Sequence, residues 1–251
     1  MTRRRFHAPP SAFNLHRGSV TLATDEARYL REVLRLKVGD EVYVFNGEGK
    51  EFRSQIEESR RDTATLKVVE EVAPARPESP LALTLAVALL KGEKFDLVVQ
   101  KATELGASRI VPVVTKLADI RLRDTSDASK RISRWQRIAL EASKQSGRAV
   151  VPDVANPVAF ESMVGETDSG SAIMFSERDG QPLAEVLGDW SSNLHSLTAL
   201  VGSEGGWTDH EITLVRESGW RVITLGGRTL RAETAAITVA ALLQHLFGDL
   251  G

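Results

Sequence analysis

The chain has 251 residues, with 42% hydrophobic and 26% charged residues, values typical of a globular protein with one large or two modest domains. It contains no cysteine, which excludes a disulfide, a thiolate nucleophile and a cysteine metal site. The formal net charge of −2 argues against a protein that binds nucleic acids non-specifically over its whole surface. No apolar run approaches the roughly 20 residues of a membrane span, and no apolar stretch follows the basic N-terminus, so we expect a cytoplasmic protein without a membrane partner.

The N-terminal third reads as a small β-rich unit. Arg3, Arg4 and Arg5 precede Phe6, and such a cluster can pair with phosphates while the aromatic ring stacks on a base. Thr24 is expected to cap a short helix that ends near residues 37–40 and carries Arg31 and Arg35 on its polar faces. Strands are predicted at 41–45, 51–57 and 63–72, with a hairpin at residues 46–47, an Asn-Gly pair.

A proline-rich segment marks the predicted domain boundary. Residues 73–80 contain three prolines, which is the best linker in the chain. We therefore expect a first domain at residues 1–73, a linker at 74–80 and a second domain at 81–251.

The second domain alternates between strands and helices. Strands are expected at 83–90, 110–114, 172–175, 197–201 and 221–225, with helices after most of them, the last helix ending at Phe247. This succession predicts a mainly parallel sheet covered by helices on both sides.

One predicted helix, from about Ser129 to Ser143, is strongly basic. Between residues 121 and 148 there are eight basic and three acidic residues, whereas residues 166–217 contain ten acidic and two basic ones. This asymmetry favours one face built for a polyanion, although charge runs are also typical of solvated helix faces. The basic residues are Arg121, Arg123, Lys130, Arg131, Arg134, Arg137, Lys144 and Arg148.

Two glycine loops in the last fifty residues carry the strongest functional signal. Residues 202–206 (Gly-Ser-Glu-Gly-Gly) follow a buried strand and precede a helix opened by Thr208 and Glu211, a capping box. Residues 226–234 follow the next strand and contain Arg228 and Arg231 at a helix N-terminus, where cations are disfavoured unless an anion or an electron-rich ligand binds there. In open α/β sheets, ligands lie outside the carboxyl ends of the strands.

Several other chemistries lack their characteristic residues. The first loop is neither G-x-G-x-x-G nor a P-loop, which weakens a nucleotide-dependent oxidoreductase. It is not a G-x-S-x-G nucleophile elbow either, so a hydrolase is a poor interpretation. The histidines show no metal-ligand spacing, and we expect no metal.

These two loops resemble those of the 16S rRNA uridine-N3 methyltransferase family of the SPOUT superfamily. The resemblance covers nearly the whole chain. It includes residues 30–35 (Leu-Arg-Glu-Val-Leu-Arg), residues 100–106 (Gln-Lys-Ala-Thr-Glu-Leu-Gly) and residues 145–148 (Gln-Ser-Gly-Arg), in the family's order. It implies an α/β protein whose C-terminal SPOUT-type parallel sheet contains a trefoil knot, preceded by a small PUA-like β-barrel domain that binds RNA. It also implies a homodimer.

The resemblance further implies the reaction and its site. S-adenosyl-L-methionine (SAM) would donate a methyl group to N3 of a specific uridine in 16S rRNA of the small ribosomal subunit. Arg231 would stabilise negative charge on the uracil oxygens, and Glu233 or Glu204 would orient the base or accept its proton. The residues expected to bind the cofactor are Phe175, Ser176, Val201, Gly202, Ser203, Glu204, Gly205, Gly206, Leu225, Gly226, Leu230, Arg231 and Ala235. Those expected to bind RNA are Arg3, Arg4, Arg5, Arg31, Arg35, Lys130, Arg134, Arg137 and Arg148.

Three positions depart from the family pattern. Ser203 and Gly227 stand where the family has prolines, and Ala232 stands where it has threonine. The loss of two prolines is expected to loosen both loops through added unfolded-state entropy. Two alternatives stay open: a SPOUT methyltransferase of tRNA or another rRNA, and a catalytically silent RNA-binding or ribosome-assembly protein.

Overall fold

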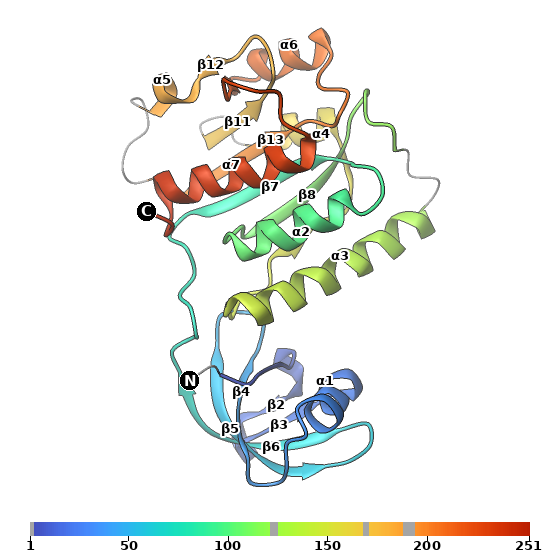
Figure 1. The fold of residues 1–251 in the computed structure, drawn as a ribbon, viewed down its shortest axis with the longest axis vertical. Coiled ribbons are helices and arrows are strands. Elements are labelled where there is room, and N and C mark those ends of the chain that lie inside the picture. The colour runs from blue at the N-terminus through green and yellow to red at the C-terminus, as the bar shows by residue number, and fades with distance from the viewer. Residues whose placement is uncertain (1–2, 121–124, 168–170, 188–193) are drawn as a thin grey trace. The chain divides into compact units, whose positions relative to one another are not determined.

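The computed structural model describes residues 3–120, 125–167, 171–187 and 194–251 (Figure 1). Contacts divide the chain into two compact units, Met1–Glu78 with Leu140–Val151, and Ser79–Ala139 with Pro152–Gly251. The division near residue 78 falls inside the predicted proline-rich linker. Residues 140–151 group with the first unit, although the sequence analysis assigns them to the second domain.

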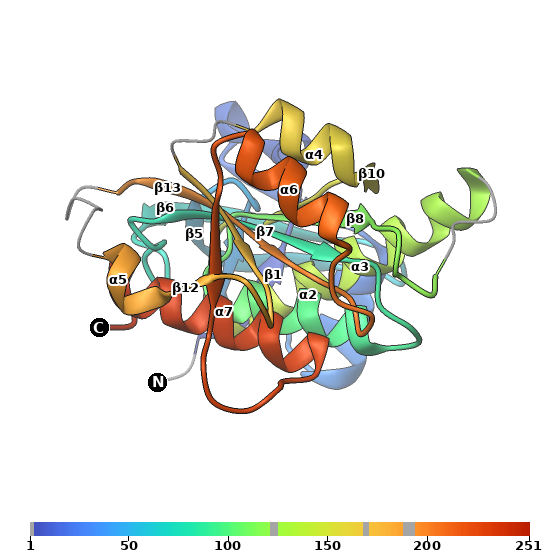
Figure 2. The same cartoon turned by 90° about the horizontal axis from the view of Figure 1, so that it is seen from above.

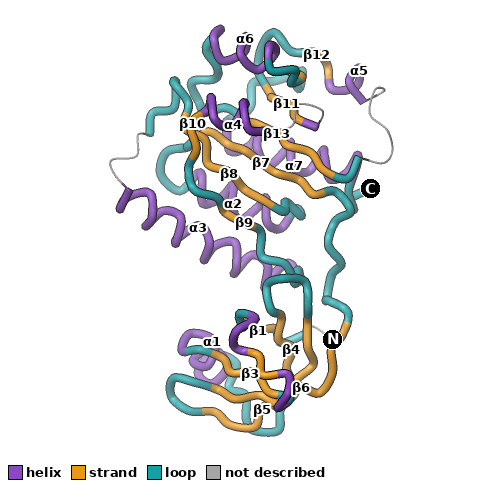
Figure 3. The backbone as a smooth tube through the Cα atoms, turned by 180° about the vertical axis from the view of Figure 1, so that it is seen from behind, coloured by secondary structure: helices purple, strands orange, loops and turns teal. Residues whose placement is uncertain are grey.

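The first unit is built mainly from strands, as Figure 3 shows. Its six-stranded sheet has the order β1-β4-β5-β6-β3-β2, and every pair is antiparallel except β1 with β4. The strands are β1 (Arg5–His7), β2 (Phe13–Asn14), β3 (Ser19–Leu22), β4 (Glu41–Phe45), β5 (Glu51–Ser59) and β6 (Ala64–Val72). Two 3₁₀ turns, Pro10–Ala12 and Leu15–Arg17, flank β2.

The helix of the first unit differs in detail from its prediction. Helix α1 (Thr24–Arg28) continues as a π-helical turn at Tyr29–Val33. Its N-cap is Ala23, which offers no side-chain hydrogen bond, so the predicted capping role of Thr24 is wrong. The predicted hairpin is confirmed, because β4 pairs with β5 and the Asn46 side chain accepts hydrogen bonds from the backbone of Glu48 and Lys50.

The second unit contains the predicted parallel sheet. Its strand order is β10-β8-β7-β13-β11-β14-β12, with β9 also paired to β8, and every ladder is parallel. The strands are β7 (Ala82–Ala88), β8 (Arg109–Val114), β9 (Asp153–Val154), β10 (Val158–Ala159), β11 (Ala172–Phe175), β12 (Gln181–Pro182), β13 (Ser196–Val201) and β14 (Arg221–Thr224).

Helices cover both faces of this sheet. Figure 2 shows α2 (Lys94–Glu104) and α7 (Ala232–Phe247) on one face, and α4 (Phe160–Glu166) and α6 (Asp209–Glu217) on the other. The remaining helices are α3 (Thr125–Ser146) and α5 (Leu183–Leu187). Phe160, Trp207 and Trp220 are buried with the sheet residues in one hydrophobic cluster, which fixes α4 and α6 against their face.

Candidate active site

Three loops meet at one edge of the parallel sheet. Strand β11 lies between β13 and β14, and all three run in the same direction, so their carboxyl ends are neighbours. The segments that follow them begin at Ser176, Gly202 and Leu225. Together they line a cavity of about 520 Å³, a volume within the usual range for small-molecule sites.

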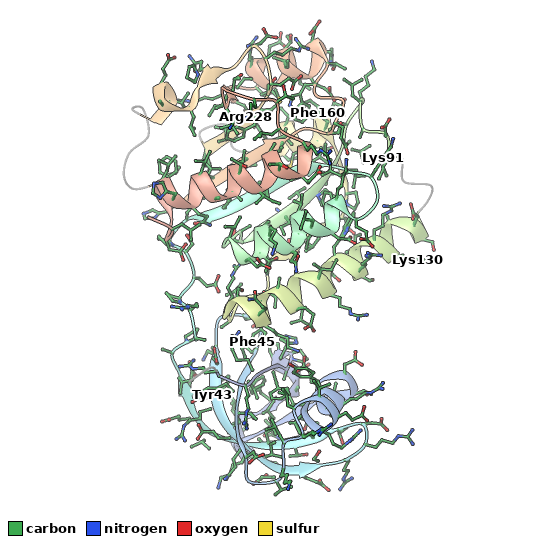
Figure 4. All side chains as sticks on the ribbon, in the orientation of Figure 1. Tyr43, Phe45, Lys91, Lys130, Phe160 and Arg228 are labelled. Atoms are coloured by element: carbon green, nitrogen blue, oxygen red, sulfur yellow. The ribbon has the colours of Figure 1, made fainter. Side chains whose placement is uncertain are left out.

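Every residue predicted to bind the cofactor lies in the lining of this cavity. The lining also contains residues that the sequence analysis did not assign: Glu177, Trp207, Thr224, Gly227, Arg228, Thr229 and Ala232. Most are direct sequence neighbours of assigned residues, so the loops could have been assigned as whole segments. Figure 4 labels Arg228, on the loop that precedes α7.

The glycine loop after β13 packs too closely against its surroundings to hold larger residues. A Cβ atom at Gly205 would lie 2.7 Å from the backbone oxygen of Leu117. Gly206 adopts φ +67°, and a Cβ there would lie 2.5 Å from a carboxylate oxygen of Glu177. Contact with the Leu117 backbone therefore requires glycine at position 205, whereas the positive φ favours glycine at position 206.

Side-chain hydrogen bonds tie this loop to its neighbours. The predicted capping box is confirmed, since Thr208 accepts from the Glu211 backbone and Glu211 accepts from the Thr208 backbone. The other oxygen of the buried Glu211 accepts from the backbone N–H of Lys116, 3.1 Å away. The indole of Trp207 donates to the carbonyl of Phe175 at 2.8 Å. These bonds place the loops after β8, β11 and β13 at fixed positions around the cavity.

Two of the three predicted catalytic residues, Glu204 and Glu233, lie near one cation that was not predicted from the sequence. Lys94, the first residue of α2, donates to Glu204 at 2.6 Å and lies 3.9 Å from the nearer carboxylate oxygen of Glu233. Glu204 lines the cavity, whereas Glu233, in the first turn of α7, does not. The turn before Lys94 has an ordinary composition, so the sequence does not mark Lys94 as a residue of the site. Only its short distances to the two carboxylates do so.

Arg231 stands apart from this group of ion pairs. It is the N-cap residue of α7, lines the cavity and is exposed. Within the described part of the chain its guanidinium has no hydrogen bond and no ion pair, so its donors are available to a ligand.

The charges at this edge influence the protonation of Glu204. Partial burial of Glu204 opposes its ionisation, but the hydrogen bond from Lys94, a backbone hydrogen bond at Glu204 itself and the positive charge of Lys94 together outweigh that effect and hold the pKa of the carboxyl below its usual value. The hydrogen bond to Glu204 also raises the pKa of Lys94 above its ordinary value. Both groups are therefore charged near neutral pH.

Two residues predicted to bind RNA are buried in the first unit. The Arg5 guanidinium donates to both carboxylate oxygens of Glu51 at 3.2 Å and to the carbonyls of Ser143, Lys144 and Arg148. Arg148, also buried, donates to Glu78 at 2.6 Å. Both were predicted from the sequence to hold phosphates, and the structure corrects this: their donors serve the fold of the first unit, because buried charges need partners.

The other predicted RNA contacts divide into paired and unpaired groups. Arg3 donates a hydrogen bond to Glu51, and Arg31 donates hydrogen bonds to the carbonyls of residues 60 and 61. Arg134 forms an ion pair with Asp96. The remaining four are exposed, with no hydrogen bond or ion pair of their side chains among the described residues: Arg4, Arg35, Lys130 and Arg137. Figure 4 labels Lys130 on α3. Arg121 and Arg123 lie outside the described residues.

The family departure at Gly227 has a conformational basis. Gly227 adopts φ +84°, which proline cannot reach because its ring holds φ near −65°. The loop after β14 therefore takes a shape that the proline usual in the family would forbid. Ser203, at the other departure, is buried, and its hydroxyl has no hydrogen-bond partner in the described structure.

Two other kinds of feature are absent from the described residues. The described residues contain no cluster of His, Cys, Asp or Glu side chains arranged to hold a metal ion. Within the same ranges, no helix combines the length and apolar character that crossing a membrane requires.

Comparison with protein families gave two matches. The family described as "RNA methyltransferase domain" matches residues 77–244, and that described as "RNA methyltransferase PUA domain" matches residues 22–69. The first match covers most of the second unit, including the three loops around the cavity, and the second lies within the first unit.

Individual relatives agree with these matches. The chain is 35% identical to the ribosomal RNA small subunit methyltransferase E of Synechocystis sp., covering 91% of this chain and 74% of that protein, and 32% identical to that of Rickettsia conorii, covering 91% of each. Among solved structures, the Neisseria gonorrhoeae enzyme of the same name, bound to S-adenosyl methionine, is 32% identical with a TM-score of 0.88 and covers 100% of both chains. Lpg2936 of Legionella pneumophila, solved with bound SAM, is 30% identical with a TM-score of 0.89 over 100% of both chains. The chain thus belongs to the RNA methyltransferase family and, within it, to the ribosomal RNA small subunit methyltransferase E group.

Proposed function

We propose that this protein transfers a methyl group from SAM to N3 of a uridine in 16S rRNA of the small ribosomal subunit. The observation that carries the proposal is the cavity formed by three strand-end loops, with Arg231, which has no side-chain partner among the described residues, in its lining. The relatives named above, two of which were solved with SAM, support the same cofactor.

The cavity fits this cofactor in size and in chemistry. Its volume of about 520 Å³ suits a ligand of SAM's size, and the glycines allow close approach to the backbone. The Ser203 hydroxyl is buried without a partner and supplies a hydrogen-bonding group. Glu177 contributes a carboxylate to the lining, which suits a positively charged ligand. The apolar side chains of Leu225 and Leu230 suit the adenine ring.

The chain's own residues would then act on the uracil. When bound, SAM supplies an electrophilic methyl group on its sulfonium. Uracil N3 carries a proton at neutral pH, so this proton must leave before or as the N–C bond forms. Arg231 would stabilise the negative charge that develops on the uracil oxygens, and Glu233 or Glu204 would orient N3–H or accept its proton. These residues would in this way hold the uracil so that the N3 lone pair could take the methyl group that bound SAM would supply.

Binding of the RNA would involve both units. Because pairing hides the N3 edge in a duplex, the target must be unpaired or flipped out of its stack. We assign the phosphate contacts to the exposed and unpaired Arg4, Arg35, Lys130 and Arg137. The first unit, which contains the PUA-family match, would serve as the RNA-binding domain with predicted bounds 1–73, and residues 81–251 would form the methyltransferase domain.

The family resemblance supports three further parts of the proposal. The C-terminal segment would be threaded into a trefoil knot, the protein would act as a homodimer that completes the site, and it would work in the cytoplasm. Size-exclusion chromatography with light scattering tests the dimer directly.

Methyl transfer to isolated RNA substrates tests the reaction. Radiolabelled SAM would be incubated with small ribosomal subunits that lack the modification, with naked 16S rRNA and tRNA in parallel. The expected result is label in the subunits that is recovered as N3-methyluridine after nuclease digestion. Label in tRNA alone would reassign the substrate. An absence of label, together with an absence of SAM binding in calorimetry, would favour the silent RNA-binding protein.

A further inference from the structure

Lys94 joins two acidic residues that come from different parts of the second unit. Its ammonium lies 2.6 Å from Glu204, on the loop after β13, and 3.9 Å from Glu233, in the first turn of α7. Lys94 itself begins α2. One lysine therefore connects three segments that are far apart in the sequence, directly beside the cavity.

The two carboxylates are not equivalent. The Glu233 side chain is only 12% exposed, and one of its oxygens is buried without a hydrogen bond among the described residues. That oxygen is the one 3.9 Å from the Lys94 ammonium. A buried carboxylate is costly unless a cation compensates it, so Lys94 supplies the charge that Glu233 needs.

Glu204 has the opposite surroundings. Its side chain is 32% exposed, it lines the cavity, and it receives a direct hydrogen bond from Lys94. Glu204 therefore faces the cavity, whereas Glu233 is not part of its lining. Of the two candidate acids, Glu204 is therefore the one placed to meet a substrate.

We propose that Lys94 is a positioning residue of the methyl transfer: anchored by the largely covered Glu233, it holds Glu204 in place as the carboxylate that accepts the hydrogen bond of uracil N3–H. This inference rests on the proposed function and assigns the two acids different parts in it. Glu204 touches the base, whereas Glu233 acts only through Lys94. Arg231, on the adjoining N-cap of α7, takes the charge on the uracil oxygens.

Other charged groups also act on this arrangement. Asp119, from the segment after β8, opposes the ionisation of Glu204 by its negative charge, and Arg231 opposes the protonation of Lys94. Lys91, 2.5 Å from Asp119, balances that carboxylate. The pKa of Glu204 is nevertheless lowered, because the hydrogen bond from Lys94, a backbone hydrogen bond at Glu204 itself and the charge of Lys94 together outweigh burial and Asp119.

The Lys94→Met and Lys94→Arg variants test the proposal by the pH dependence of methyl transfer. Lys94→Met should lower kcat by about 10- to 100-fold and leave the Kd for SAM within about twofold. Without the cation the pKa of Glu204 rises, so the acidic limb of the rate profile should move to higher pH. Lys94→Arg keeps the charge and should keep the limb near its original pH. Lys101→Met, which removes an ion pair farther along α2, is the matched control and should change neither quantity.

A second measurement does not depend on activity. The carboxyl carbon of Glu204 can be followed by NMR in protein labelled with carbon-13 glutamate, with Glu204→Gln identifying its signal. The pKa of the Glu204 carboxyl should be lowest in the wild type and highest in Lys94→Met. In Glu233→Gln it should have an intermediate value.

Each negative result has a distinct meaning. Equal titration of Glu204 in the wild type and in Lys94→Met, or an unchanged acidic limb, would overturn the role of Lys94. If the wild type transfers no methyl group to any RNA, the proposed function fails and the role in catalysis fails with it. The NMR titration then still decides whether Lys94 controls Glu204.

Discussion

The arginines of the two units differ in how completely their donors are used. In the first unit, Arg5 is surrounded by acceptors, and its partner Glu51 is fully buried and also receives bonds from Arg3 and from the backbone of Ala75. At the cavity of the second unit, Arg231 is exposed and has no partner among the described residues. Both residues stood out in the sequence as candidate contacts to an anion.

This difference separates structural from functional charge. A guanidinium whose donors are all occupied gains nothing from an RNA phosphate, because a new contact would break existing bonds and leave Glu51 unpaired in a buried position. A guanidinium that is unpaired at a helix N-terminus is electrostatically unfavourable until an electron-rich ligand arrives. Whether the guanidinium donors of an arginine are already occupied by protein acceptors thus predicts which arginines act on RNA, whereas the residue type alone does not.

The largest expected effect comes from breaking the saturated network. Glu51→Gln leaves the buried Arg5 without a counter-charge and should lower the free energy of unfolding by about 3–5 kcal/mol. Urea unfolding followed by circular dichroism would measure it. Glu71→Gln, which removes an exposed ion pair with Lys50, should have almost no effect. Similar stability of the two variants would show that burial does not distinguish these networks.

A comparable loss, in activity instead of stability, is expected at the cavity. Arg231→Ala removes the donor proposed for the uracil oxygens and should reduce kcat by about 10²- to 10³-fold. Calorimetry should find SAM binding retained and the unfolding midpoint unchanged, because Arg231 has no partner within the described residues. Arg109→Ala, at the opposite edge of the same sheet, serves as the control. Near-normal turnover of Arg231→Ala would remove it from the mechanism.

The glycine loop should respond with a smaller loss. Gly206→Ala places a Cβ at φ +67° and 2.5 Å from Glu177. The free loop is expected to relax away from this conformation, and SAM binding would have to restore it at a cost of about 1–2 kcal/mol. The Kd for SAM should therefore rise by roughly 5- to 30-fold. Gly165→Ala, in α4 with open space around it, should leave the Kd unchanged. An unaltered Kd in Gly206→Ala would mean that this loop does not contribute to cofactor binding.

How far these features were predictable depends on the range of the interactions involved. The parallel sheet, the capping box at Thr208 and the glycine loops follow from local patterns. The predicted cofactor residues came instead from the family resemblance, and all of them lie in the lining of the cavity. The short strands β9, β10 and β12 have two residues each, too few for a periodic signal.

Long-range pairing explains the larger errors. The bonds from Arg5 reach Glu51 and the end of α3, which are 46 and about 140 positions away, and no local pattern reports them. The same holds for Lys94 and Glu204, which are separated by 110 positions. A single sequence shows which residues are charged, but only the fold decides which charges neutralise one another.

The smallest expected effect tests the same distinction along a single helix. On α3, Lys130 and Arg137 are unpaired among the described residues, whereas Arg131 and Arg134 are paired with Asp127 and Asp96. The double variant Lys130→Gln with Arg137→Gln should weaken binding to 16S rRNA and reduce the slope of log K against log salt concentration by roughly 1.5 to 2, because two phosphate contacts release fewer counterions. Filter binding at several salt concentrations would measure both variants. Arg131→Gln with Arg134→Gln removes the same charge and should change the slope less. Equal slopes would mean that total charge, and not the availability of donors, governs how this helix binds RNA.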